Sequence, residues 1–73
     1  MSEMMMPCSY EAEQAVLGGL MLDNDRWDEV ILQISPEDLF SRPHRMVFRV
    51  MAELAGEGLP LDLITITERL ENK

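Results

Sequence analysis

Apolar residues recur along the chain at the three- and four-residue spacing of amphipathic helices, and proline, glycine and short polar clusters interrupt them. A first helix is predicted to begin near Tyr10, because Pro7 cannot lie in a helix interior and Ser9 is a favourable N-cap. Its apolar stripe is broad, so this helix should be nearly buried. The stripe comprises Ala12, Ala15, Val16, Leu17, Gly19, Leu20 and Met21.

A second helix should follow at once, because Asp23 and Asn24 end the first helix and can cap the next one. The apolar positions after them match the i, i+3, i+4, i+7 template and give the clearest amphipathic signal in the chain. They are Trp27, Val30, Ile31 and Ile34.

Two serine-proline signals mark the middle of the chain. Ser35 precedes Pro36, and Asp38 stands three residues after the serine, so a short helical turn should begin here. Ser41 repeats the signal and starts what should be the longest helix, which runs to Ala55. Its apolar side comprises Val47, Val50, Met51 and Leu54, and the stretch from Gly56 to Gly58 stops it.

The stretch from residue 61 to residue 67 permits two interpretations. Its β-branched residues are typical of a strand, whereas Asp62 followed by Leu63, Ile66 and Leu70 resembles a capped helix. A helix is favoured because no second strand is available to pair with it. The predicted fold class is therefore all-α, a small bundle of four principal helices plus a short helical turn.

A pair of glycines lies inside the first predicted helix. A glycine in a helix interior costs about 1 kcal/mol relative to alanine, so Gly18 and Gly19 need a compensating role. Close packing is the favoured explanation, with Trp27 or Phe48 against the space that a missing Cβ leaves. Phosphate binding is the alternative, but it requires glycines in a loop before a helix rather than within one.

Composition narrows the class of protein. The chain has 73 residues and a formal net charge of -8, which makes direct nucleic-acid binding by the isolated domain unexpected. The single Cys8 fits a reducing compartment, and the apolar run from residue 15 to residue 22 is too short to span a membrane. We therefore expect a cytoplasmic domain over residues 9–73, preceded by a disordered segment over residues 1–8.

The sequence contains no pattern of residues that predicts catalysis or cofactor binding. His44 is the only histidine and has no partner at the spacing of a metal site or a nucleophilic dyad, so it should lie in the first turn of the long helix without a chemical role. Glu11 and Glu13 are interpreted as helix-start and solvent-facing charge. There is no GxxxxGK[ST] motif for nucleotide binding. We therefore predict that this chain has no catalytic, metal-binding or cofactor-binding residues.

The long helix carries the one concentration of basic residues in the sequence, Arg42, Arg45 and Arg49. Arg45 and Arg49 are one turn apart, and Glu53 lies one turn further on. The simpler interpretation is a solvated face with a weak ion pair. The alternative is a stripe that docks a partner, so these three residues are the candidate partner-binding residues.

The order of several short segments resembles the N-terminal domain of the bacterial replicative DNA helicase, the hexameric DnaB family. The segments cover nearly all of residues 7–71 in the order that the family shows. They are Pro7 and Ser9, EAEQAVLGGLMLDN (residues 11–24), RWDEV (26–30), PEDLF (36–40), RPHRMVF (42–48) and PLDLITITERL (60–70).

This resemblance implies the globular head of an all-helical collar domain, whose partners would be other helicase subunits and primase. The family continues into a helical hairpin and a motor domain that uses ATP and magnesium to unwind DNA in the 5′ to 3′ direction. Without the hairpin, oligomerisation should be weaker. Two hypotheses follow. The chain is a helicase N-terminal domain that supports hexamer assembly and primase recruitment, or it is a stand-alone small protein derived from such a domain that modulates helicase or primase.

Overall fold

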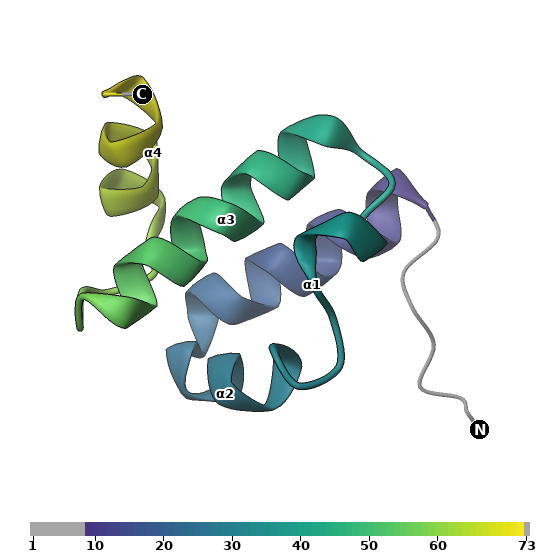
Figure 1. Cartoon of the computed structure of the whole chain (residues 1–73), viewed down its shortest axis with the longest axis horizontal. Coiled ribbons are helices and arrows are strands. Elements are labelled where there is room, and N and C mark those ends of the chain that lie inside the picture. Colours follow the sequence, from purple (N-terminus) through teal and green to yellow (C-terminus); the bar gives the residue numbers. More distant parts are fainter. Residues whose placement is uncertain (1–8, 73) are drawn as a thin grey trace.

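The structure is a computed structural model that describes residues 9–72. Within this range the regular elements are all helical, as Figure 1 shows. In chain order they are α1 (Tyr10–Leu22), the 3-10 turn η1 (Asn24–Arg26), α2 (Trp27–Val30), the 3-10 turn η2 (Pro36–Asp38), α3 (Arg42–Gly56) and α4 (Leu63–Glu71). The predicted all-α class is confirmed. The expected disorder of residues 1–8 lies outside the described residues.

Helix α3 is the centre of the arrangement. Helix α1 runs beside it in the same direction, α4 lies beside its C-terminal half, and η2 packs against it as well (Figure 1). A single apolar core joins these elements, so each short helix is stabilised by tertiary packing rather than by its own length. The core consists of Leu17, Leu20, Trp27, Leu39, Phe48, Val50, Met51, Leu54, Leu61 and Ile66.

Three of the predicted helix starts are confirmed by their caps. The Ser9 hydroxyl accepts a hydrogen bond from the Ala12 N–H at 3.0 Å, and the Asp38 carboxylate accepts one from the Ser35 N–H at 2.9 Å. Asp62 accepts from the Thr65 N–H at 2.8 Å, and this bond lowers the pKa of its carboxyl. The last segment is therefore a capped helix and not a strand.

The second helix is shorter than the sequence pattern predicts, and this prediction was wrong in its extent. Helix α2 ends at Val30, and the chain then turns through residues 31–33. The Gln33 N–H and the Ile34 N–H both donate to the Val30 carbonyl, so the regular helical pattern is lost there. Pro36 disfavours helical backbone at the residue before it, and the chain must also turn back toward α3.

The sequence pattern predicted that Asn24 caps the second helix, but the Asn24 side chain forms its hydrogen bonds with other residues. Its amide nitrogen donates to the Leu20 carbonyl at 2.7 Å and to the Leu61 carbonyl at 3.2 Å, and its amide oxygen accepts from the Leu61 N–H at 2.8 Å. One side chain thus satisfies the C-terminal end of α1 and holds the segment before α4 against it.

A left-handed glycine ends α3. Gly58 has φ +75°, and its N–H donates to the Ala55 carbonyl at 3.1 Å. The next residue, Leu59, donates to the Leu54 carbonyl at 2.9 Å, which completes a Schellman motif. The chain can therefore reverse within a few residues and send α4 back along α3.

We predict that Gly58→Ala lowers the free energy of unfolding by about 1–2 kcal/mol, because an L-residue with a Cβ is strained in the left-handed region. Urea unfolding followed by circular dichroism measures it. Gly56→Ala is the matched control, since Gly56 is the last residue of α3 and a Cβ there meets no atom within 4 Å. The control should leave stability unchanged or raise it, and equal losses in both variants would contradict the prediction.

Candidate functional site

The candidate partner-binding residues on α3 are all engaged within the chain. One Arg45 guanidinium nitrogen donates to the Leu39 carbonyl at 2.8 Å and to the Phe40 carbonyl at 3.0 Å. Arg49 forms an exposed ion pair with Glu37 at 3.6 Å. These contacts hold the loop that precedes α3 and the η2 turn against the helix.

The third candidate, Glu53, pairs across the α3 and α4 interface rather than along α3. Its carboxylate lies 3.2 Å from an Arg69 nitrogen, and Glu57 binds the same guanidinium at 2.7 Å. These bonds raise the pKa of Arg69 above its ordinary value, Glu57 contributing more than Glu53. The structure thus separates the three candidates into contacts with different elements, and their role in binding a partner stays a prediction.

A buried carboxylate joins α1 to the start of α3. The Glu13 side chain is completely buried, and its oxygens accept hydrogen bonds from the Phe40 N–H and from the Ser41 N–H, the latter at 3.0 Å. His44 lies 2.9 Å away through Nδ1. Because a carboxylate only accepts, the His44 Nδ1 carries the proton.

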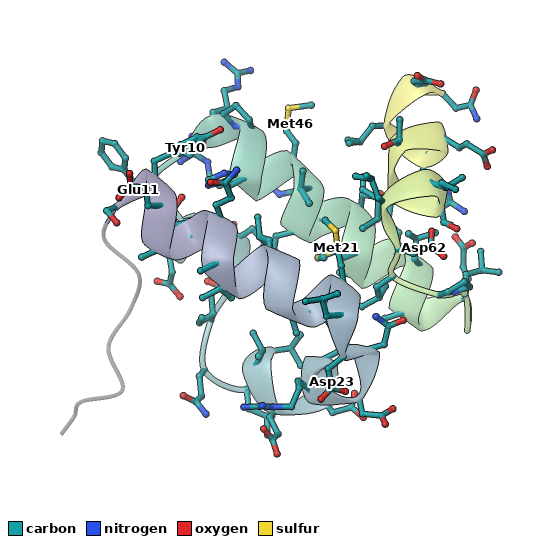
Figure 2. All side chains as sticks on the ribbon, turned by 180° about the vertical axis from the view of Figure 1, so that it is seen from behind. Tyr10, Glu11, Met21, Asp23, Met46 and Asp62 are labelled. Carbon is teal, nitrogen blue, oxygen red and sulfur yellow. The ribbon has the colours of Figure 1, made fainter. Side chains whose placement is uncertain are left out.

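His44 occupies the first turn of the longest helix, as predicted, but it is also a buried member of this cluster. It is 7% exposed, and the Tyr10 ring lies against it with a centroid separation of 4.4 Å. Figure 2 shows Tyr10 at the start of α1, beside the end of α3 that carries His44. The interpretation of Glu13 as solvent-facing charge was wrong, whereas Glu11 is exposed.

A pattern in the sequence could have found this pair. Glu13 precedes Leu17 and Leu20 at the i, i+4, i+7 spacing of the buried face of α1. On α3, His44 begins the corresponding buried series with Phe48 and Met51. An acid and a histidine at the same end of two core-facing stripes indicate a buried polar pair when the helices run in parallel.

The environment of Glu13 favours its charged form. Burial by itself raises the pKa of this carboxyl, but the hydrogen bonds from His44 and from the backbone N–H groups of Phe40 and Ser41 lower it by more. The net pKa lies below the ordinary value for glutamate. These two N–H groups immediately precede α3, so the carboxylate also lies near the positive end of the helix dipole.

The two glycines of α1 do not have the packing role that we expected. A Cβ built at Gly18 or at Gly19 meets no atom of the described residues within 4 Å. Trp27 and Phe48, which were expected to lie against the gap, are buried and pack on each other with ring centroids 5.1 Å apart. Gly19 instead lines an open hollow of about 240 Å³ between α1 and α2.

Large apolar side chains remain exposed on several elements of the described structure. Two of them are almost fully exposed, Leu22 at 91% and Leu32 at 85%. The others are Tyr10, Ile31, Phe40, Met46, Leu59, Leu63 and Ile64. Figure 2 shows one of them, Met46, on the face where α3 and α4 meet. Side chains of this kind are available for contact with another protein.

Over residues 9–72, no group of three or more histidine, cysteine, aspartate or glutamate side chains is arranged to hold a metal ion. None of the helices in this range has the length and apolar character that crossing a membrane requires.

The comparisons with known proteins agree on one family. A family model described as "DnaB-like helicase N terminal domain" matches residues 5–73. The chain is 55% identical over 67 residues to the "Replicative DNA helicase DnaB" of Buchnera aphidicola subsp. Acyrthosiphon pisum. The matched residues make up 92% of this chain and 15% of that protein.

More distant relatives carry the same name. The protein of Haemophilus influenzae is 42% identical over 67 residues, covering 92% of this chain and 14% of the relative. The protein of Geobacillus stearothermophilus is 41% identical over 69 residues, covering 94% of this chain and 15% of the relative. The chain therefore spans about 15% of the length of the curated relatives that it matches.

We predict that Glu13→Gln lowers the free energy of unfolding at pH 7 by about 2–3 kcal/mol, because the substitution replaces a charged acceptor with an amide that presents N–H groups to buried donors. Thermal and urea unfolding measure it. Glu11→Gln removes the same charge from the exposed first turn of α1, and we expect a loss below about 1 kcal/mol there. Equal effects of the two variants would show that burial of Glu13 is unimportant.

The same pair of variants tests a pH dependence. Because the pKa of Glu13 is lower in the folded state than in the unfolded state, its contribution is complete above the unfolded pKa, about 4.3, and is lost as the pH falls through the folded pKa. Stability of the wild-type chain and of Glu11→Gln should fall more steeply below about pH 4.3 than that of Glu13→Gln. Parallel curves would contradict the assignment.

Because the space beside the α1 glycines is open, Gly18→Ala and Gly19→Ala should each raise the free energy of unfolding of the isolated chain by up to about 1 kcal/mol. Chemical denaturation of the two single variants checks this. Destabilisation by either one would mean that the glycine makes a contact within the chain after all.

Proposed function

We propose, from the premise that this chain belongs to the family of DnaB-like helicase N-terminal domains, that it acts as a protein-interaction domain of a replicative DNA helicase, in hexamer assembly and primase recruitment. The family match over residues 5–73 is the observation that carries the proposal. In this proposal the segment supplies contacts between proteins, and other parts of the protein unwind the DNA.

Two features of the described residues support a role in contacts. The hydrogen bonds of Glu13 with Ser41 and His44, together with the apolar core, join the helices into one unit with a defined outer surface. On that surface nine large apolar side chains remain exposed, together with the open hollow beside Gly19. A subunit or a primase that covered them would bury apolar area that folding of this chain leaves in water.

The experiment is a segment exchange. Residues 5–73 would replace the aligned segment of the Buchnera aphidicola replicative helicase, to which they are 55% identical, and the chimera would be compared with the unaltered helicase. We expect the chimera to form hexamers by analytical ultracentrifugation and to retain binding to the primase of that organism. A helicase with the segment deleted is the control.

The two parts of the proposal fail separately. A chimera that is folded but does not form hexamers contradicts the assembly role. A hexameric chimera that does not bind primase contradicts the recruitment role. Binding of helicase by the separate 73-residue chain, with inhibition of unwinding, would instead favour a stand-alone modulator.

A further inference from the structure

A second and larger groove lies between α2, the turn that follows it, and the C-terminal half of α3. Its volume is about 500 Å³. The packed rings of Trp27 and Phe48 form its floor. Both rings are more than nine-tenths buried, so the floor is fixed by the core of the domain rather than by mobile surface side chains.

The two walls of the groove differ in size. On α3, Ala52 and Gly56 are exposed and one helical turn apart, so this wall is low. On the opposite side, Ile31 is 44% exposed and Ile34 is half-buried. Small residues on one wall let another helix approach closely, and branched apolar residues on the other provide contact area for it.

The charges around the groove select the kind of helix. Asp28 is the only charged side chain among the described residues that line it. The C-terminal end of α3 at Gly56 opens onto the same groove, and helix C-termini carry partial negative charge. The chain as a whole carries a net charge of -8, which adds to the attraction of this groove for a cationic partner.

We propose that the groove between α2 and α3 docks a basic amphipathic helix of a partner protein. The apolar face of that helix would cover Trp27, Ile31 and Ala52, and a lysine or arginine would lie near Asp28 and the end of α3. The inference concerns one surface of this chain and does not depend on hexamer assembly or primase recruitment. The groove proposal can therefore fail while the proposed function stands, and the proposed function can fail while the groove proposal stands.

The test uses the intact chain and a synthetic helical peptide of leucine, alanine and lysine, with leucine at i, i+3, i+4 and i+7 and lysine along both flanks. Trp27 is the only tryptophan, so its fluorescence reports on the groove directly. We expect saturable quenching or enhancement, with amide chemical-shift changes centred on Ile31, Ala52 and Gly56. A peptide of the same composition in scrambled order should bind at least about tenfold more weakly.

Two substitutions locate the binding. Ala52→Arg fills the groove and adds a like charge, and it should weaken binding of the peptide at least about tenfold. Asp28→Asn should weaken it several-fold, whereas Asp25→Asn, which removes the same charge from an exposed site outside the lining, should change it less than about twofold. Circular dichroism of each variant confirms that the helices are intact.

Four results would overturn the proposal. Equal binding of the scrambled peptide would show that only net charge is recognised, and equal losses in Asp28→Asn and Asp25→Asn would show the same. Chemical-shift changes centred outside the groove would place the peptide elsewhere. Self-association of the chain that Ala52→Arg abolishes, measured by sedimentation equilibrium without peptide, would show that a second copy occupies the groove.

Discussion

The structure depends on a single buried carboxylate. Glu13 is fully removed from solvent, which would cost several kcal/mol if its charge were left without partners. Its donors are two backbone N–H groups before α3 and the imidazole of His44. Since all three come from the start of α3, the carboxylate sets the N-terminal ends of α1 and α3 at the same end of the molecule. This contact fixes one end of the helix pair, and the apolar core joins the two parallel helices along their length.

The remaining polar contacts extend the same arrangement. Arg45 holds the loop before α3, Arg69 joins α4 to the far end of α3, and Asn24 holds the chain before α4 against the end of α1. Arg45 and Arg69 link α3 to the segments before and after it, and Asn24 links the end of α1 to Leu61. A domain of 73 residues has a thin core, so these links keep a fixed outer surface that the core alone would define poorly.

The sequence was a reliable guide wherever structure is decided locally. The caps at Ser9, Ser35 and Asp62 need only a side chain and an N–H three residues away, and the starts of α1, η2 and α4 were predicted correctly. The length of α2 and the surroundings of the glycines depend on where distant segments pass, and both were mispredicted. The donors to Glu13 also lie 27 to 31 residues away along the chain, but its spacing with Leu17 and Leu20 was a local signal of burial that the interpretation missed.

The same difference between local and distant determinants applies to the candidate binding surfaces. The three candidate residues on α3, Arg45, Arg49 and Glu53, were identified by their spacing. Their contacts with Leu39, Glu37 and Arg69 could be found only from the folded structure. No sequence pattern indicated the groove between α2 and α3, because it exists only where the end of α3 passes the turn after α2. Family membership in turn came from the order of short segments, which is independent of any single site.

The most direct test of the Glu13 constraint is hydrogen exchange of the Phe40 and Ser41 amides. The Phe40 side chain is 78% exposed and both residues lie outside regular helix, so an ordinary surface loop would exchange quickly there. If Glu13 holds these N–H groups, their protection should approach that of the core amides of α3. Exchange at the rate of an open loop would contradict the central role assigned to this carboxylate.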